Sequence, residues 1–408
     1  MKPYDVLIIG GGAAGFFTAI NVAEQNPNLK IAILERGQDV LGKVKVSGGG
    51  RCNVTHAQFE PKELSKRYPR GEKELLGPFH SFMTGDTITW FEERGIALKI
   101  EDDGRMFPVS DSSQTIIDCF LSEVNRLGIS LIKSASVKAL ERENTVWKVS
   151  TNTDVYTCDK LVVATGSNPK IWKMITQLGH TIIPPVPSLF TFNIKDQRIQ
   201  DLAGVATNVS VMVRGTDGKE LLQSEGPLLI THWGMSGPAI LKLSAWGARI
   251  LEPLHYNFAI QINWLFNASE EYTMENLMDS KGVNPKQTVQ KYAQLDVPKR
   301  LWQRLVVASG IDVTETWAEI SKIKLQNLAN QLTKSHFHVE GKSTFKEEFV
   351  TAGGVDLKEI NFKRFESKLH PNLFFAGEVL NIDAITGGYN FQNAWTGGFL
   401  VAKAIIEE

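Results

Sequence analysis

The stretch Tyr4-Asp5-Val6-Leu7-Ile8-Ile9-Gly10-Gly11-Gly12-Ala13-Ala14-Gly15, continued by Leu34-Glu35-Arg36, decides the fold of this chain. The β-branched run from Val6 to Ile9 predicts a fully buried parallel strand. A helix from Ala13 to about Asn26 and a second strand from Lys30 to Leu34 should follow. Strand, glycine turn, helix and strand together predict a Rossmann-type nucleotide-binding unit of the α/β class.

The three glycines at 10, 12 and 15 have the G-x-G-x-x-G spacing. Gly10 should make the tight turn, Gly12 should let the backbone approach a pyrophosphate, and Gly15 should let the helix pack on the strand. The N–H groups at the start of that helix, around Ala14, would point at the phosphates. Glu35 stands twenty residues after Gly15, where an acid can bind a ribose 2′-OH and repel a 2′-phosphate. This much predicts an adenine dinucleotide and leaves NAD and FAD both open.

Composition limits the remaining choices. The 408 residues are enough for two or three domains, and the formal net charge of −1 gives no general attraction to nucleic acid. Three cysteines form no disulfide framework, which fits a reducing cytoplasm. No window of eighteen uninterrupted apolar residues predicts a membrane span. His336 and His338 have no third ligand nearby, so we expect no metal site.

A second glycine-rich stretch runs from Ser47 through Gly48, Gly49 and Gly50 to Arg51, Cys52 and Asn53. Three consecutive glycines are unfavourable in a regular element and suit a loop that lies flat against a ligand. Arg51 would bring a fork of donors and a positive charge to that ligand. A surface loop without a ligand is the alternative. A lone cysteine such as Cys52 is more often a small buried residue than a reactive thiol.

Between these loops and residue 188 the pattern continues as helices and strands. We expect helices at Thr84–Arg94 and Ser113–Leu127, and a hairpin spanning Ile96–Val109 around Asp102-Asp103-Gly104. Strands should follow at 129–133, 137–141 and 147–150. The strand ending in Ala164-Thr165-Gly166 either closes over the cofactor or is simply a strand end.

From Ser188 to about Lys346 the pattern changes to short strands and then helices. Strands are expected at 189–194, 209–214, 221–223, 228–231, 256–264, 337–340 and 345–349, with a turn at Thr216-Asp217-Gly218. The spacing of apolar residues predicts helices in residues 269–334. Nine Lys/Arg against four Asp/Glu between Lys281 and Lys334 are typical of a solvated helical face, and contact with a nucleic acid or an acidic ligand is the sharper alternative.

The stretch Thr231-His232-Trp233-Gly234-Met235-Ser236-Gly237-Pro238 comes between a strand and the helix 239–248. It lacks the G-x-S-x-G spacing of a serine nucleophile, because Gly237 follows Ser236 directly. A loop facing the reactive ring of the cofactor is the better interpretation, and it makes His232 a candidate catalytic residue.

The last sixty residues favour FAD over NAD. A strand at Leu373–Phe375 leads to Ala376-Gly377-Glu378, and Thr386-Gly387-Gly388-Tyr389-Asn390-Phe391-Gln392 opens a helix to Glu408. Only a long cofactor needs both ends of the chain: Glu378 can hold its ribityl or pyrophosphate region. The N-terminus of the last helix can direct positive charge at N1 and C2=O of a flavin.

At this point the chain resembles the BaiN/RdsA-type (YhiN-like) NAD(P)/FAD-dependent flavoproteins, through residues 47–53, 231–238 and 377–392. The resemblance implies a discontinuous FAD-binding domain, 1–188 plus 347–408, with an inserted β-barrel-like domain, 189–265 plus 335–346, and a helical subdomain, 266–334. It also implies FAD contacts from Gly10–Gly15, Glu35, Arg36, Lys43, the backbone near Val137, Gly377, Glu378, Asn390, Phe391 and Gln392. Where the family pattern is Val-Leu-Asp-Val-Asp-Gly, this chain has Val379-Leu380-Asn381-Ile382-Asp383-Ala384, which argues against proton transfer by the first acid.

The sequence thus predicts a cytoplasmic FAD-dependent oxidoreductase that passes hydride through flavin N5 to or from a small organic substrate. Arg51, His232 and Tyr389 are the residues expected to face the flavin ring. No second G-x-G-x-x-G with a following acid occurs in 150–345, so NADH or NADPH would bind only transiently. An RNA-directed flavoprotein and a flavin-binding protein with little turnover are the alternatives, and the overall charge does not favour a nucleic-acid partner.

Overall fold

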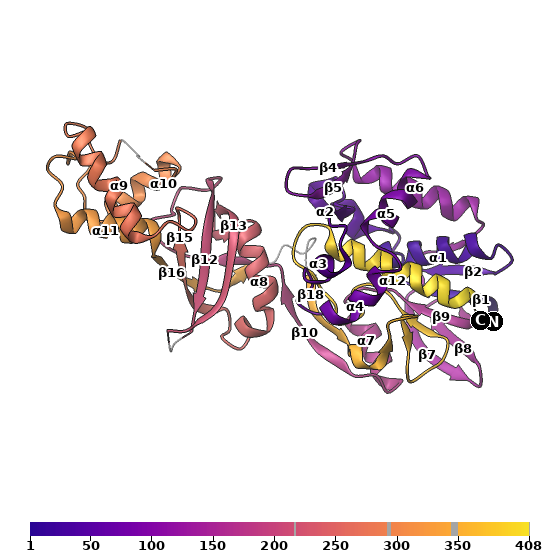
Figure 1. Cartoon of the computed structure of the whole chain (residues 1–408). Helices are drawn as coiled ribbons and strands as arrows, with labels where there is room; N and C mark the ends of the chain where they lie inside the picture. The colour runs from indigo at the N-terminus through magenta and orange to yellow at the C-terminus, as the bar shows by residue number, and fades with distance from the viewer. Residues whose placement is uncertain (216–217, 292–294, 344–349, 408) are drawn as a thin grey trace. The chain divides into compact units, whose positions relative to one another are not determined.

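The computed structural model describes residues 1–215, 218–291, 295–343 and 350–407. The chain forms two compact units, coloured by residue number in Figure 1. The first comprises Met1–Val186 and Lys346–Glu408, and the second Pro187–Phe345. Residues 266–334, expected as a separate helical subdomain, fall within the second unit.

A parallel sheet forms the centre of the first unit. Its parallel strands are β6 (Ser130–Ile132), β2 (Ile31–Leu34), β1 (Lys2–Ile9), β9 (Val155–Val163) and β21 (Leu373–Phe375), in that spatial order. In register, Ile9 lies opposite both Leu34 and Val163, and Val163 lies opposite Phe375. The carboxyl ends of four strands therefore meet at one edge, where open α/β sheets bind their ligands.

Antiparallel strands extend this sheet and form two smaller ones. The sheet is extended by β7 (Val137–Glu143), β8 (Val146–Thr151), β19 (Ile360–Asn361) and β20 (Glu366–Ser367). The smaller sheets are β3 (Thr55–His56), β5 (Arg105–Pro108) and β4 (Leu98–Ile100), and the pair β10 (Ile182–Ser188) and β18 (Val350–Val355). The pairing of β4 with β5 confirms the hairpin predicted around Gly104.

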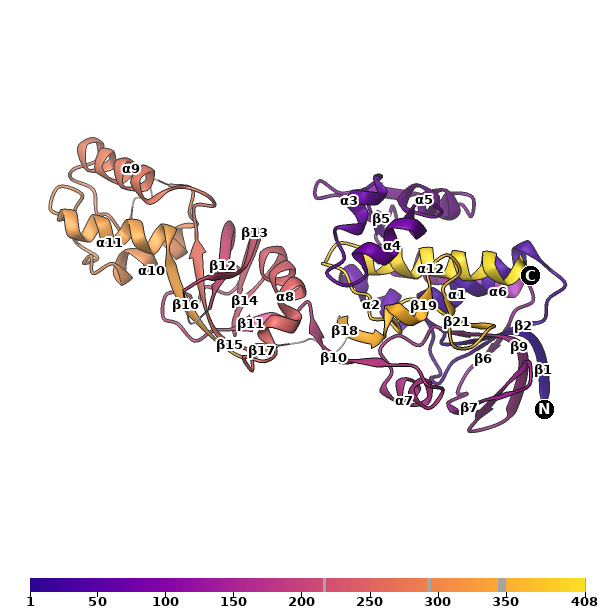
Figure 2. The same ribbon diagram turned by 60° about the horizontal axis from the view of Figure 1, so that its bottom comes forward.

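Helices cover both faces of the parallel sheet. On one side lie α1 (Ala13–Gln25), α6 (Ser113–Arg126) and α12 (Tyr389–Ile406), and on the other α7 (Pro169–Gln177) with β7 and β8, as Figure 1 and Figure 2 show. The remaining helical segments of this unit are α2 (Gly42–Gly50), α3 (Pro61–Ser65), α4 (Glu72–Phe79), α5 (Thr84–Glu92) and η1 (Leu357–Glu359).

Aromatic side chains fix the two helices from opposite ends of the chain against each other. The ring of Phe17 on α1 lies 5.2 Å from Trp395 on α12 and 4.6 Å from Trp90 on α5, measured between centroids. The absence of a side chain at Gly398 lets α12 pack closely on α1: a Cβ at this position would lie only 3.2 Å from the Ala14 carbonyl oxygen. The first and last helices therefore share one core, although almost the whole sequence separates them.

Among its described residues, the second unit has a seven-stranded sheet, whose strands pair in the antiparallel sense, and four helices. Its strands in spatial order are β16 (Ser335–Glu340), β15 (Asn257–Asn263), β12 (Ala206–Arg214), β13 (Glu220–Thr231), β14 (Gly234–Ser236), β11 (Thr191–Asn193) and β17 (Lys342–Ser343). The helices are α8 (Pro238–Leu251), α9 (Glu270–Val283), α10 (Lys299–Ala308) and α11 (Lys322–Thr333). Buried Trp264, Trp302 and Trp317 belong to its core.

One sequence prediction differs from this structure, one agrees in part, and two fall on residues outside the described ranges. Two short strands were expected at 221–223 and 228–231, but β13 continues through Gly226 and Pro227, which stay paired with Val209 and Asn208 of β12. The loop expected at the three glycines after Ser47 is confirmed in part: α2 extends to Gly50, but Ser47, Gly48 and Gly49 have non-helical backbone angles within it. The turn at Thr216-Asp217 and the strand at 345–349 lie outside the described residues.

No helix in the part of the chain that the structure describes is both long and apolar enough to cross a membrane. The same residues contain no group of three or more His, Cys, Asp or Glu side chains arranged to hold a metal ion.

Candidate functional site

The loop after β1 separates the three glycines into different roles. A Cβ on Gly10 would lie 2.3 Å from the Ala164 carbonyl oxygen, and one on Gly15 would lie 2.0 Å from that of Gly10. Neither position tolerates a side chain without a shift of the backbone. A Cβ on Gly12 would meet nothing within 4 Å. Gly12 is also the N-cap of α1, and no side chain caps that helix end. The space beside Gly12 therefore suits a pyrophosphate on a helix N-terminus.

Glu35 lies at the end of β2 and faces this loop. Its Oε2 accepts a hydrogen bond from the Gly11 N–H at 2.9 Å, and its Oε1 accepts one from the Gly37 N–H at 2.8 Å. A carboxylate has about four lone-pair positions, so acceptor capacity remains for ribose hydroxyls. The Ala135 N–H donates to the Glu35 carbonyl at 2.8 Å, which brings the start of β7 at Val137 close to this site.

Three further segments converge on the start of α1. Gly377 has a φ of +75°, and a Cβ there would lie 3.1 Å from the Cβ of Ala14. Lys43 on α2 forms an ion pair with Glu378. Gly166 approaches the same carboxylate, because a Cβ on it would lie 3.6 Å from Glu378 Oε2. Segments that are far apart in sequence are thus assembled around one glycine loop.

The second glycine loop presents open backbone. Gly48, Gly49 and Gly50 all have positive φ, at 57°, 69° and 86°, a conformation that favours glycine. Gly49 and Gly50 are exposed, and a Cβ on either would contact nothing within 4 Å. Ser47 keeps its hydroxyl on the Val44 carbonyl at 3.0 Å. These features fit a loop that a ligand can approach closely, and the contact itself stays a prediction.

The side chain of Arg51 is already engaged by the β4–β5 hairpin. Its guanidinium lies 2.5 Å from Glu101 Oε1 and 3.4 Å from Asp111 Oδ1, and it covers the Phe107 ring at 3.9 Å. Hydrogen bonding to Glu101 raises the pKa of Arg51 further. These contacts explain how Arg51 is held, and its predicted place at the flavin ring remains a prediction.

Cys52 is fully buried, and burial raises the pKa of its thiol to about 12. At neutral pH the sulfur is therefore a thiol and no nucleophile, as we expected. Its neighbour Asn53 packs against the start of α12, because a Cβ on Gly388 would lie 2.8 Å from Asn53 Oδ1.

The N-terminus of α12 packs against β3 and against the segment after α3. Gly388, its N-cap, has a φ of +92°, and a Cβ there would lie 2.5 Å from the Thr55 carbonyl oxygen. The Tyr389 ring stacks on His56 with centroids 4.5 Å apart. His56 Nδ1 lies 3.0 Å from the Gly387 carbonyl oxygen, so this nitrogen is the donor. The Tyr68 hydroxyl donates to the Tyr389 carbonyl at 2.6 Å. Sequence reasoning missed both His56 and Tyr68.

The loop before α12 is held by a buried ion pair between Arg70 and Asp383, in which both carboxylate oxygens are used. Asp383 is fully buried. Asn390 closes the same loop by accepting from the Ala384 N–H at 3.0 Å. No local pattern could have paired Arg70 with Asp383, because 313 positions separate them in the chain.

The other predicted residues on α12 have their side chains in the protein interior. Gln392 is fully buried and accepts hydrogen bonds from the hydroxyls of Thr55 and Thr87 at 2.6 and 3.0 Å. Phe391 stacks on Trp395 at 5.6 Å. Cofactor contacts of these two residues stay predictions. Because the side chain of Gln392 is buried, any contact that this residue makes with the cofactor would come from its backbone.

His232 belongs to the second unit and lies with Trp233 in a two-residue turn that joins β13 to β14. Both side chains are exposed. The turn is fixed at its base because a Cβ on Gly234 would lie 2.1 Å from the Phe192 carbonyl oxygen. A β-hairpin therefore precedes α8, where we expected a loop without regular structure. A role of His232 at the flavin stays a prediction.

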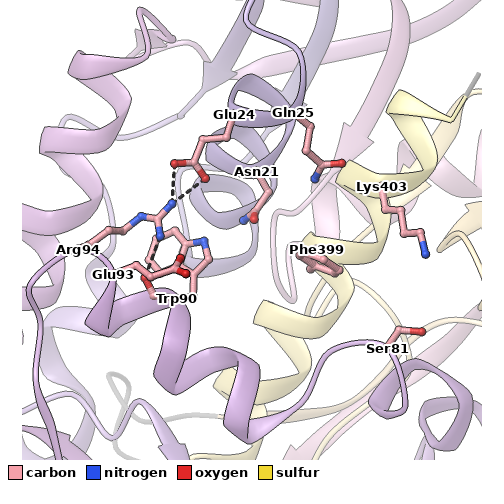
Figure 3. A pocket seen from close by; sticks show the side chains of 9 residues that line it. All are labelled: Asn21, Glu24, Gln25, Ser81, Trp90, Glu93, Arg94, Phe399 and Lys403. Atoms are coloured by element: carbon pink, nitrogen blue, oxygen red, sulfur yellow. Dashed lines mark hydrogen bonds and ion pairs between the residues drawn. The ribbon is translucent and has the colours of Figure 1, made fainter.

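A separate shallow cavity of about 560 Å³ lies elsewhere in the first unit (Figure 3). It is bordered by the last turns of α1 and by Phe399 and Lys403 of α12, at the ends of these helices remote from Gly12 and Gly388. Figure 3 shows the Arg94 guanidinium on both carboxylate oxygens of Glu24, each at 2.6 Å. This cavity is therefore distinct from the nucleotide loop.

The residues present fit an FAD molecule. The open backbone at Gly12 and the uncapped start of α1 suit its pyrophosphate, and Glu35 suits its adenosine ribose. The uncapped start of α12 offers a second positive helix end at the same edge of the fold. One nucleotide alone would leave that second end without a ligand, whereas a long cofactor uses both.

Comparison with known proteins agrees with this geometry. A family model described as the HI0933-like protein Rossmann domain matches residues 4–404. The ribosomal RNA dihydrouridine synthase of Haemophilus influenzae is 30% identical, over 98% of each chain. The 3-dehydro-bile acid delta(4,6)-reductase of Clostridium scindens is 25% identical, over 98% of each chain. The 3-ketosteroid-delta4-(5alpha)-dehydrogenase of Rhodococcus jostii RHA1 has a similar structure, with a TM-score of 0.52 at 11% identity, over 100% of this chain and 97% of that one.

Proposed function

Because this chain belongs to the HI0933-like family of flavoprotein oxidoreductases, we propose that it reduces a carbon–carbon double bond conjugated to a carbonyl group. The enzyme is an FAD-dependent oxidoreductase, and the proposal concerns its substrate class and its source of electrons.

The observation that carries the proposal is what two full-length relatives have in common. Dihydrouridine is uridine in which the double bond next to a ring carbonyl has been saturated. A delta(4,6)-reductase of a 3-dehydro-bile acid acts on double bonds conjugated with the 3-oxo group. Both names describe the addition of two hydrogens to an electron-poor double bond, although their substrates differ in size and polarity.

When bound, a reduced flavin supplies hydride to such a double bond. The start of α1 would hold the pyrophosphate, and Glu35 and Glu378 would bind hydroxyl groups of the cofactor. The start of α12, with about half a positive charge, would stabilise the anionic reduced ring. Tyr389 would act there as an acid, because burial raises the pKa of its phenol to about 12 and it keeps its proton at neutral pH.

Uracil in ribosomal RNA is the substrate that we favour within this class, because the relative at 30% identity is named for it. The basic excess at 281–334 adds support. Ion pairs engage Arg304, Lys324 and Lys334, but Lys286, Lys291, Lys299 and Lys322 are exposed and form no ion pair with any described residue. Such lysines can contact phosphates. A small enone is the competing substrate.

The experiment is anaerobic turnover with FAD and either NADH or NADPH. One arm contains ribosomal RNA lacking dihydrouridine and the other a 3-oxo-Δ4 steroid, with products identified by the mass of two added hydrogens. We expect saturated product in at least one arm, and a steep loss of RNA turnover with salt if uracil is the substrate. Flavin that is reduced by the nicotinamide but transfers nothing to either substrate would contradict the proposal.

A further inference from the structure

Arg67 stands out in the first unit because no described residue neutralises its charge. It follows α3, is half-buried, and its side chain makes no hydrogen bond or ion pair with any described residue. Its Nε is buried and unpartnered. A buried polar atom without a partner is unfavourable in a folded protein, and a charged one more so.

Neighbouring arginines behave differently. Arg51 contacts Glu101 and Asp111, Arg70 contacts Asp383, and Arg94 contacts Glu24. Each of these guanidinium groups is neutralised by a carboxylate of the chain itself. Arg67 forms no ion pair with a carboxylate of the described residues, although its charge lowers the pKa values of Glu63 and Tyr389 at longer range. Its environment therefore fits an oxygen atom supplied by a ligand.

The backbone fixes Arg67 beside the start of α12. Its carbonyl accepts a hydrogen bond from the Ile385 N–H at 3.0 Å, in the loop that leads to Gly388. The next residue, Tyr68, is fully buried and donates its hydroxyl to the Tyr389 carbonyl. The positive charge of Arg67 lowers the pKa of the Tyr389 phenol against the larger effect of burial, so the two side chains are close enough to interact.

We propose that Arg67 binds the carbonyl oxygen of the substrate and stabilises the enolate formed during reduction, with Tyr389 as the proton donor. This rests on the proposed reduction of a conjugated double bond. Hydride from the two-electron-reduced flavin adds to the β-carbon, and the π electrons move onto the carbonyl oxygen, where a fixed guanidinium offers hydrogen bonds and charge. The Tyr389 hydroxyl then gives its proton to the α-carbon and recovers one from solvent, which leaves a saturated carbonyl compound and oxidised flavin.

The test uses the oxidised FAD-loaded protein and 4-nitrophenol, whose phenolate resembles an enolate and absorbs visible light. Titrating the phenol with protein over a range of pH gives its affinity and the apparent pKa of the bound phenol. Wild type should bind phenolate in preference to phenol. Arg67→Gln should weaken phenolate binding about ten- to a hundredfold and abolish the preference. Arg67→Lys should retain part of it.

Lys62→Gln is the matched control, because it removes an exposed positive charge from α3, five positions away, and should change phenolate affinity less than twofold. Tyr389→Phe should keep phenolate binding but form product more slowly.

Two results would overturn the assignment. The first is an Arg67→Gln protein that binds phenolate as wild type does. The second is an Arg67→Gln protein that loses FAD from its visible spectrum, since Arg67 would then hold the cofactor. Because the titration needs no turnover, Arg67-dependent binding in a protein that reduces no double bond would contradict the proposed function, and of this assignment it would leave only the binding of an oxyanion by Arg67.

Discussion

The two helix N-termini at the cofactor edge are built in different ways. At the start of α1, the positions that matter are Gly10, Gly12 and Gly15, all within one turn and its flanks. At the start of α12, the positions that matter are His56, Tyr68 and Arg70, which come from more than three hundred residues away. Arg70 pairs there with Asp383, which lies in the loop just before the helix.

The start of α1 is thus determined by residues close together in the sequence, and the start of α12 by residues that are far apart. The α1 end needs only the absence of side chains, so it leaves an open backbone for a phosphate. The α12 end needs side chains that lock a loop in place, as is required of a charge that must point at a reacting ring. Substitutions at the start of α1 and at the start of α12 should therefore change different properties of the protein.

The largest effect is expected from Asp383→Ala, which leaves the Arg70 guanidinium without its buried partner. Breaking a buried ion pair from one side costs about 3–5 kcal/mol, and we expect a loss of that size in the free energy of unfolding by urea. The double variant Arg70→Met/Asp383→Leu should recover most of it. A single variant as stable as wild type would show that the pair does not hold this loop.

Gly15→Ala comes next, because its Cβ would lie 2.0 Å from the Gly10 carbonyl oxygen and must displace α1 from β1. Overpacking of this kind costs about 1–3 kcal/mol, measurable by urea unfolding of the protein without FAD.

Gly12→Ala is the matched control at the same loop. No atom lies within 4 Å of its Cβ, so the protein without FAD should keep its stability and only FAD affinity should fall, by about tenfold or more. Equal stability losses in both variants would mean that the three glycines do not have separate roles.

A smaller effect is expected from His56→Phe, which keeps an aromatic ring against Tyr389 but removes the hydrogen bond to the Gly387 carbonyl. One such bond contributes about 1 kcal/mol. The reduction potential of bound FAD should fall slightly, because the start of α12 is held less firmly, while FAD content stays at the wild-type level. Full loss of FAD would mean that His56 supports binding and not the position of the helix.

The smallest effect is expected from pH. Since the pKa of the Tyr389 phenol is raised to about 12, its proton is present throughout pH 6–10, and reoxidation of reduced flavin by substrate should show no phenol ionisation in that range. Tyr389→Phe should be slower at every pH. A wild-type rate that falls with a midpoint near 9 would show an acid other than this phenol.

The sequence predicted the α1 end almost completely. The run Val6–Ile9, the glycine spacing and Glu35 are local features, and each has the place in the structure that its chemistry requires. The strands after β1 were also recognisable from their burial pattern. Local propensity and local packing agree here, which is why a pattern of forty residues was sufficient.

The α12 end was predicted only in outline. The glycines before Tyr389 indicated a helix start, but Arg67, His56 and Asp383 carry no local signature. Their importance comes from contacts between distant segments, and a single sequence does not contain that information. The same reason explains why the side-chain hydrogen bonds of Gln392 to Thr55 and Thr87 in the interior were not foreseen; its cofactor contact, which the family resemblance implied, stays a prediction.

The central claim is tested most directly by a single turnover without oxygen. The FAD-loaded protein is photoreduced, mixed with ribosomal RNA or a 3-oxo-Δ4 steroid, and followed by flavin absorbance. The account predicts that one of these substrates reoxidises the flavin and gains two hydrogens, with one saturated bond formed per flavin. A flavin that stays reduced with both substrates, and is reoxidised only when oxygen is admitted, would contradict it.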